Sequence, residues 1–377
     1  MMKQLEIQGF APEILQCAET AFSVNGVYDK IRLSLNRTGD YNLLIPFNVT
    51  EASVKRNPSY KVALADVTSK MLQSFDSAVK TYTEIYKEIE SIISEEEYKE
   101  RLDKLVPKKY VKRVFDVSKP KMEEAEQLIQ EERKSREICG LAIDEKKNSS
   151  ELLKLMEEKW NELHEYFIEV EALNEEKRNQ IYLSQYQLEK EQLEGYLYGE
   201  ESFVLNSVEG IFTSIEFTED FQVQYDYNKE SGILCMEVKF PSDHLLYLPF
   251  ETATLYSTGK LSVKSKTKKD LEQEHSLFYS GLGLYLSSLC FNISSKIQRI
   301  RFSITKPYEG LYWVEFDRNN FANLKVDSLN PIIEIQSVPN VLKLNAAGNL
   351  VGIPMSKFNT LIQNLQGYLV GPAVQKI

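Results

Sequence analysis

Hydrophobic residues recur at steps of three and four along the middle of the chain, which is the spacing of an amphipathic helix. The first series occupies these positions: Leu64, Val67, Met71, Phe75, Ala78, Tyr82, Ile85, Ile89 and Ile92. A second series comprises Met156, Trp160, Leu163, Phe167 and Val170, and resumes at Ile181 and Leu188. Series of this length are typical of coiled coils and long bundles. The sequence therefore predicts a helical arm over residues 56–199, arranged as an antiparallel hairpin or an elongated bundle.

Both ends of the chain show the two-residue alternation of β-strands instead. Residues 28–47 predict two short strands around a turn, after a helix in APEILQCAETAFSV. Residues 200–330 predict a hairpin, further strands, an apolar helix and a second hairpin, with the helix glycines (GLGLYL) allowing close packing on the sheet. An antiparallel sheet covered by a helix is an α+β arrangement.

The predicted fold class is therefore α+β, with three domains along the chain. A small mixed α/β module with a β-hairpin occupies residues 1–55, the long helical arm follows at 56–199, and an antiparallel-sheet-plus-helix domain occupies 200–377.

Composition narrows the class of protein without identifying a function. The chain has 377 residues, of which 42% are hydrophobic and 27% charged, as in a folded globular protein. Its net charge of −11 argues against a surface that is basic throughout, so nucleic-acid binding would need a local patch. The start has no secretory signal pattern, and no stretch is apolar enough to span a bilayer, so we expect a cytoplasmic protein. Scattered cysteines and only three histidines predict no metal site and no cofactor.

One short segment carries candidate catalytic chemistry. In DYNKESGILCMEVKFP, Asp226 precedes the Glu-x-Lys triplet of Glu237 and Lys239 by eleven residues. That is roughly the spacing of metal-dependent nucleases, in which carboxylates hold Mg²⁺ and the lysine orients the attacking water. The same alternation also fits a plain β-hairpin with the two charges on its solvated face. The segment therefore allows either a nuclease site or an ordinary exposed ion pair.

Two basic runs are candidate nucleic-acid contacts. The first comprises Lys260, Lys264, Lys266, Lys268 and Lys269, and the second comprises Lys108, Lys109, Lys112 and Arg113. Lysines also gather on loops and edge strands simply to prevent sheets from pairing edge to edge. The runs allow a nucleic-acid-binding adaptor but do not require one.

The second helical series supplies candidate partner-binding residues. Trp160 and Phe167 are large apolar side chains in the predicted seam, and Asn174 interrupts it. A polar residue within such a seam can fix register and partner choice. We therefore expect the helical arm to self-associate or to bind a protein partner through these residues.

The C-terminal third resembles an uncharacterised domain of bacterial coiled-coil proteins associated with restriction and phage defence. The segments that carry the resemblance are YDYNKESGILCMEVKFP, HSLFYSGLGLYLSSLCFNI, IQRIRFSI and YWVEFDR. The resemblance implies a bacterial intracellular accessory protein and transfers no catalytic residue. The preferred interpretation is a non-enzymatic interaction or scaffold subunit of a multiprotein assembly, and the nuclease and the nucleic-acid adaptor are the alternatives.

Overall fold

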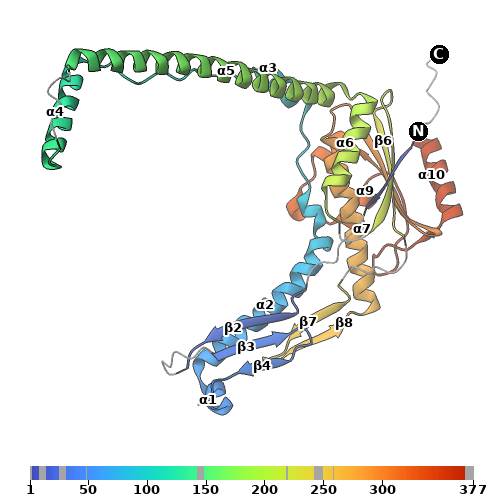
Figure 1. Ribbon diagram of the computed structural model, residues 1–377. Coiled ribbons are helices and arrows are strands. Elements are labelled where there is room, and N and C mark those ends of the chain that lie inside the picture. Colours follow the sequence, from blue (N-terminus) through green and yellow to red (C-terminus); the bar gives the residue numbers. More distant parts are fainter. Residues whose placement is uncertain are drawn as a thin grey trace, which may run out of the picture. The chain divides into compact units, whose positions relative to one another are not determined.

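The computed structural model describes residues 2–7, 14–24, 31–47, 49–141, 148–217, 220–241, 249–257 and 259–369. It confirms the mixed α and β fold class, with small N-terminal strands, a long helical region and a C-terminal sheet covered by helices (Figure 1). None of the helices in these ranges is both long and apolar enough to cross a bilayer.

The chain divides into two compact units instead of the three consecutive domains that the sequence predicts. The sheet unit combines Met1–Lys99 with Gly195–Ile377, and the helical unit is Glu100–Glu194. The N-terminal residues do not form a separate module, because their first strand pairs with a strand more than 200 residues later in the chain.

The elements of the first segment of the sheet unit are β1 (Lys3–Ile7), β2 (Cys17–Phe22), β3 (Ile31–Asn36), β4 (Tyr41–Leu44), α1 (Glu51–Arg56), α2 (Pro58–Thr83) and η1 (Ile85–Glu88). Those of its second segment are α6 (Glu201–Ser214), β5 (Phe221–Asn228), β6 (Ile233–Lys239), β7 (Glu251–Leu255), β8 (Leu261–Ser265), α7 (Lys268–Phe291), β9 (Arg299–Lys306), β10 (Glu309–Asp317), α8 (Arg318–Ala322), η2 (Val326–Ser328), α9 (Pro331–Ser337), β11 (Asn340–Leu342), β12 (Ile353–Pro354) and α10 (Met355–Leu369).

Within the described residues, the main sheet has seven strands in the order β1-β5-β6-β9-β10-β11, with β12 pairing on β10. Strands β6 and β9 are parallel, and the other pairs are antiparallel. A parallel pair needs a crossover connection, and α7 supplies it. The alternation of β5 and β6 turns apolar residues toward α6 and α7, where they form the largest core.

Helix α7 lies very close to the sheet, as its glycines predict. A Cβ added at Gly283 would overlap the hydroxyl of Tyr312, which donates a hydrogen bond to the carbonyl of Tyr279 at 2.7 Å. Glycine is therefore required there by the space between helix and sheet, and not by backbone conformation.

The opposite face of the sheet is mainly polar, and α10 covers only one end of it. Trp313, Val341, Ile353 and Phe358 form a small separate core beneath α10. The middle of this face, on β5, β6 and β9, carries the charged and amide side chains that are described below.

A second core surrounds α2, and it corrects part of the helical prediction. The stripe of α2 packs on β2, β3 and the β7–β8 hairpin, with Val67 and Met71 fully buried, and not on a second long helix. The predicted helical run also ends at Thr83, because η1 and then non-helical residues follow it. The spacing of apolar residues by three and four therefore correctly predicted a buried helix face, but it did not predict that strands cover that face.

Two N-terminal predictions have different outcomes. The hairpin is confirmed as β3 and β4, with Asn36 Oδ1 accepting a hydrogen bond from the backbone N–H of Asp40 at 2.8 Å. The helix predicted in APEILQCAETAFSV is wrong in its described part, where Cys17–Phe22 is strand β2. Pairing with β3 buries Ala18 and leaves Cys17 and Glu19 exposed, which is a strand alternation.

The helical unit contains part of α3 (Glu95–Lys104), all of α4 (Met122–Ile138) and most of the 50-residue helix α5 (Ser149–Tyr198). The described residues between α3 and α4 form no helix or strand. Instead of a second helix, this extended segment packs along the middle of α5.

A buried arginine joins three distant parts of the sheet unit. The guanidinium of Arg318 donates through Nη1 to the carbonyls of Phe291, Ser294 and Ile297 at 2.7, 3.0 and 3.2 Å. Its Nη2 donates to the carbonyl of Ile93 at 2.8 Å. Burial lowers the pKa of Arg318, but an arginine keeps its charge under all ordinary conditions. The arginine thus satisfies carbonyls that the end of α7 leaves without helical partners.

We predict that Arg318→Met lowers the free energy of unfolding by about 3 kcal/mol, because it leaves several buried carbonyls without donors. Arg56→Met, which removes an exposed arginine from α1, is the control and should change stability by less than about 0.5 kcal/mol. Urea unfolding of both variants measures the difference. Equal stabilities of the two variants would show that Arg318 does not hold these segments together.

A partly buried histidine on α7, whose Nε2 is shielded from solvent, makes stability depend on pH. Burial, together with the charges of Lys306 and Lys266, lowers the pKa of His275 to about 3. No described residue forms a hydrogen bond with its Nε2. The folded protein therefore keeps this imidazole neutral at pH values at which an unfolded chain would protonate it.

The unfolded chain protonates histidine below about pH 6.5, whereas the folded state resists until about pH 3. Above pH 6.5 His275 is neutral in both states and the free energy of unfolding has its full value. As pH falls from 6.5 toward 3, only the unfolded chain takes up the proton, so the free energy of unfolding decreases. We expect wild type to lose on the order of 3 kcal/mol more than His275→Gln between pH 6.5 and pH 4. Chemical unfolding at several pH values measures this, and parallel curves for the two proteins would contradict it.

Candidate functional site

The polar face of the main sheet holds the Glu-x-Lys triplet. In the β5–β6 hairpin, Gln224 lies opposite Glu237, Gln222 lies opposite Lys239, and Asp226 lies opposite Cys235. Successive side chains of a strand point to opposite faces, so all of these residues share the face away from α7. The register therefore places amides, and not a carboxylate, directly across from the triplet.

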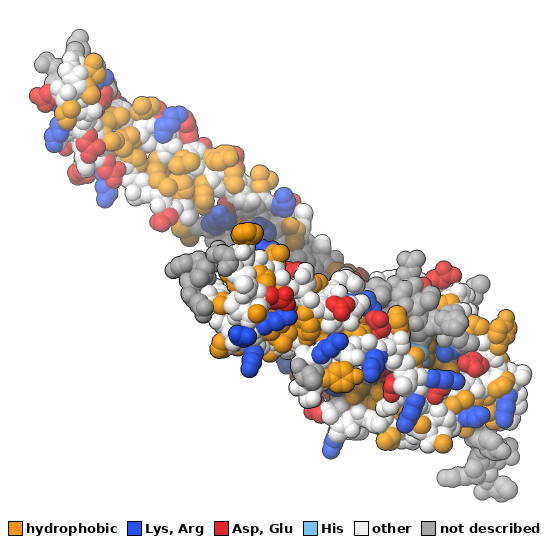
Figure 2. All heavy atoms as spheres, turned by 90° about the horizontal axis from the view of Figure 1, so that it is seen from below, with side chains coloured by type: hydrophobic (Ala, Val, Ile, Leu, Met, Phe, Trp, Pro, Cys, Tyr) orange, Lys and Arg blue, Asp and Glu red, His pale blue; other side chains and the backbone are white. Residues whose placement is uncertain are grey.

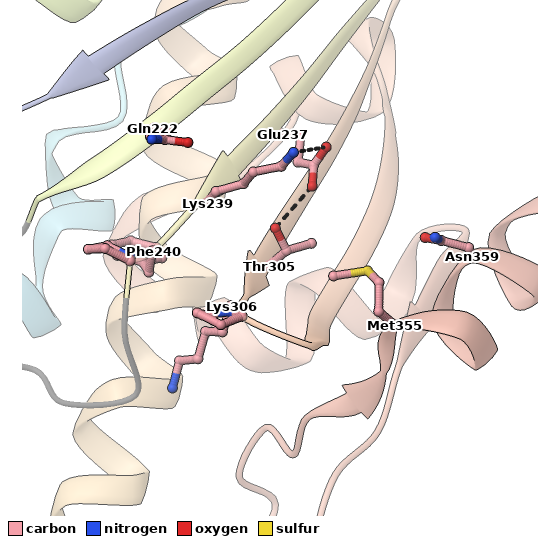
Figure 3. A pocket seen from close by; sticks show the side chains of 10 residues that line it. Gln222, Glu237, Lys239, Phe240, Thr305, Lys306, Met355 and Asn359 are labelled. Carbon is pink, nitrogen blue, oxygen red and sulfur yellow. Dashed lines mark hydrogen bonds and ion pairs between the residues drawn. The ribbon is translucent and has the colours of Figure 1, made fainter.

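The triplet is tied into a small hydrogen-bonded group (Figure 3). Lys239 Nζ lies 3.5 Å from Glu237 Oε2 and donates to Gln224 Oε1 at 3.1 Å. Thr305 Oγ1 donates to Glu237 Oε1 at 3.0 Å. Thr305 comes from β9, which the parallel pairing brings beside β6. The carboxylate and the ammonium on β6 are thus held in place by each other and by neighbours from two further strands, β5 and β9.

The two charges line a cavity instead of lying on a flat surface. Its volume is about 670 Å³, and the other residues that line it are Gln222, Phe240, Pro241, Thr305, Lys306, Pro307, Met355 and Asn359. Met355 and Asn359 belong to α10. Lys306 points away from Glu237 and Lys239 in Figure 3, and its ammonium lies over the ring of Tyr279. Lys239 is therefore the cation whose side chain faces this cavity with Glu237.

Asp226 lies two residue pairs further along the hairpin than Gln224 and Glu237, beside a different charged group. Burial raises the pKa of the Cys235 thiol, and Arg301, Asp226 and Glu315 are the charged groups that act on it. Arg301 Nε lies 2.6 Å from a Glu315 carboxylate that is almost fully buried. The predicted trio of Asp226, Glu237 and Lys239 thus shares a sheet face but not one cluster of contacts.

In the described ranges, no group of three or more His, Cys, Asp and Glu side chains could hold a metal ion. The carboxylate of Glu237, with the oxygens of Gln224 and Thr305 nearby, is a small set of hard oxygen ligands. The two carboxylates that the nuclease hypothesis requires are therefore not assembled by this register.

The first basic run is divided between surface and interior. Lys266 cannot contact a nucleic acid as predicted, because its side chain is only 3% exposed and its Nζ pairs with Glu274 at 2.5 Å. Glu274 also accepts a hydrogen bond from the Tyr82 hydroxyl at 2.6 Å. Lys264 donates to the hydroxyl of Tyr256 at 3.1 Å. Lys260, Lys268 and Lys269 are exposed, so contact with nucleic acid through these lysines stays a prediction.

The second basic run lies in the extended segment of the helical unit, which we call the strap (residues 105–121). Lys112 pairs with Glu175 of α5 at 2.8 Å, and the backbone N–H of Arg113 donates to Glu171 at 2.8 Å. Lys108 and Lys109 are exposed. This run contributes to holding the strap on α5, and its exposed members remain candidates for a nucleic-acid contact.

The strap covers two of the predicted partner-binding residues. The ring of Phe115 lies 5.6 Å from that of Trp160 and 5.2 Å from that of Phe167, between centroids. Trp160 Nε1 donates to the carbonyl of Val117 at 2.8 Å. Trp160 and Phe167 therefore bind the chain's own strap, which corrects their assignment as free partner-binding residues.

A buried carboxylate fixes the position of the strap on the helix. Glu171 is 6% exposed and accepts hydrogen bonds from the Tyr110 hydroxyl at 2.7 Å and from the Arg113 backbone. These donors, with Asn174 beside them, lower the pKa of the Glu171 carboxyl. Asn174 thus acts within the unit, next to Glu171, and the backbone N–H of Tyr110 is bound by Asn179 at 2.8 Å.

The surface of α5 that the strap leaves uncovered carries a second set of apolar residues, which we call the outer stripe. Its members are Leu155, Leu163, Tyr166, Val170, Leu173, Ile181 and Leu188. At 100° per residue they fall within ~80° of the helix circumference and extend over ~50 Å. Tyr166 and Leu173 are 65% and 66% exposed, and Figure 2 shows hydrophobic side chains on the surface of this unit.

Tyr166 and Leu173 were missed in the sequence because a single seam through Trp160 and Phe167 explained the rhythm. The segment EYFIEVEAL contains more apolar residues than a single buried helix stripe requires. That excess is the signal from which a second stripe could have been predicted. The helix thus carries two apolar stripes, of which the strap covers one.

Comparisons of this chain with models of protein families, with curated proteins and with solved structures found no match. The assignment of a function therefore depends on the geometry of the outer stripe and of the sheet cavity.

Proposed function

We propose that this chain is a non-enzymatic interaction subunit of a bacterial intracellular multiprotein assembly. The observation that carries the proposal is the outer stripe, where large apolar side chains remain exposed along a 50-residue helix that already has its strap in place. Single exposed apolar residues are common, but a row of them along one helix face marks an interaction surface, although the exposed Lys159 and Lys177 interrupt this row. The resemblance of the C-terminal third to a domain of phage-defence proteins supports a defence setting for that assembly.

The proposal predicts that a partner lies against Tyr166 in the cell. A photo-crosslinking amino acid at position 166 should give a covalent adduct with one protein, identified by mass spectrometry, in cells that express the chain naturally. The control is the same amino acid at Ile168, which is 52% exposed but lies on the opposite side of α5. Adducts of equal yield at both positions, or at neither, would contradict an interface on the outer stripe.

A metal-dependent nuclease is the second candidate, and the cavity lined by Glu237 and Lys239 is the observation that favours it. A carboxylate and an ammonium held beside a cavity of this size could bind a cation and orient water. The amides opposite the triplet weaken this candidate, since hydrolysis with a divalent ion usually requires more than one carboxylate ligand.

If the nuclease is correct, purified protein should cleave DNA with Mg²⁺ or Mn²⁺, and Glu237→Ala should reduce the rate by roughly 100-fold or more. Glu230→Ala, which removes an exposed carboxylate from the turn after β5, should leave the rate unchanged. Equal cleavage by both variants would attribute the activity to a contaminant. The absence of cleavage by wild type with either ion would remove this candidate.

A further inference from the structure

The outer stripe has a charged border that indicates what binds it. A row of exposed glutamates runs along one side: Glu151, Glu158, Glu162, Glu165, Glu169 and Glu176. Their spacing of three, four and seven residues keeps them within ~60° of the helix circumference, next to the stripe. We call this set the glutamate row. From Glu151 to Glu176 the helix has nine glutamates and two lysines, a formal charge of −7.

The glutamate row is not neutralised by the strap, because the strap lies on the other side of α5. The basic residues of the strap pair with glutamates outside the row, Lys112 with Glu175 and Lys119 with Glu157 at 3.2 Å. Within the row, Glu162 pairs with Lys159, but both side chains are about two-thirds exposed, and such pairs contribute little. The row thus presents a strong negative field beside an apolar surface.

A second copy of the chain is a poor occupant of this surface. An antiparallel pairing of two outer stripes, centred between Tyr166 and Val170, would place the two glutamate rows side by side, because the row extends to both sides of that centre. A parallel pairing would place the rows on opposite flanks of the interface, so there only the net negative charge of each helix opposes association. Like charges at the flanks of a helical interface weaken pairing and direct partner choice toward the opposite charge.

We propose that the outer stripe binds a basic amphipathic helix of another protein. This proposal rests on the proposed function and names the class of partner. The bound helix has apolar residues at steps of three and four that pack on Leu163, Tyr166 and Leu173, and lysines or arginines beside them that face the glutamate row. Apolar burial supplies most of the affinity, and the charges supply association rate and specificity.

The test uses the full-length protein and two labelled synthetic peptides of 28 residues. Both have leucine at the heptad seam positions, and they differ only in the flanking positions, which are all lysine in one and all glutamate in the other. Fluorescence anisotropy should show binding of the lysine peptide, and binding of the glutamate peptide should be weaker by more than about tenfold. The affinity for the lysine peptide should fall as salt rises.

Matched variants separate the stripe from the rest of α5. Tyr166→Ser with Leu173→Ser should weaken binding of the lysine peptide by more than about tenfold, because it removes two large apolar contacts. Ile168→Ser with Leu183→Ser removes residues of similar exposure, 52% and 50%, from outside the stripe and should bind as wild type does. Glu162→Gln, Glu165→Gln and Glu169→Gln together should weaken binding several-fold and flatten its salt dependence. Circular dichroism verifies that each variant retains its helix.

Several outcomes would overturn the inference. Equal binding of the two peptides would remove the role of charge, and equal loss in the two serine variants would remove the role of the stripe. A dimer in sedimentation velocity that dissociates only in the Tyr166→Ser and Leu173→Ser variant would identify a second copy as the occupant.

Failure of this inference and failure of the proposed function give different results. A crosslinked protein at position 166 without binding of the lysine peptide leaves the proposed function standing and overturns the basic-helix inference. Binding of the peptide through the stripe without any cellular adduct supports the inference and contradicts the proposed function.

Discussion

The guanidinium of Arg318 is the contact on which the arrangement of the sheet unit depends. It stands where β10 ends, yet its donors bind carbonyls after α7 and at Ile93, far away in the sequence. A charge that is removed from water must be compensated by polar partners, and here four backbone carbonyls accept hydrogen bonds from the guanidinium. Because carbonyls are fixed to the backbone, the arginine sets the position of whole segments. The arginine thereby holds the turn that leads from α7 into β9, the strand that pairs in parallel with β6.

That parallel pairing creates the chemistry of the sheet face. It places Thr305 beside Glu237. On this face β6 therefore lies between β5, which carries the amide of Gln224, and β9, which carries the hydroxyl of Thr305. The same crossover presses α7 onto the sheet at Gly283, so α7 closes the apolar face, while α10 packs on one end of the polar face. The helical unit is arranged differently: one face of α5 binds the strap, and another face of the same helix remains exposed.

Local patterns in the sequence correctly predicted individual strands and helix faces, but they did not predict which distant segments pack against them. The alternation around Glu237 and Lys239 identified the hairpin, and the rhythm around Val67 identified a buried helix face, because both depend only on neighbours a few residues apart. No local pattern could reveal that Thr305 meets Glu237, since 68 residues separate them. The position of the strap could not be predicted either, because an extended segment that is held by side-chain contacts shows no helical or strand periodicity in its sequence.

The pairing of β1 with β5 has a consequence for how the chain is made. Lys3 pairs with Tyr225, so β1 leaves the ribosome without its partner, which is complete only after more than 200 further residues have been synthesised. At typical translation rates that delay lasts about 10 to 40 s, far longer than the formation of a hairpin. The β3–β4 hairpin and the core around α2 can begin to form while β1 waits. The main sheet is therefore completed late, and until then the edge of β5 that β1 later covers can pair wrongly during synthesis.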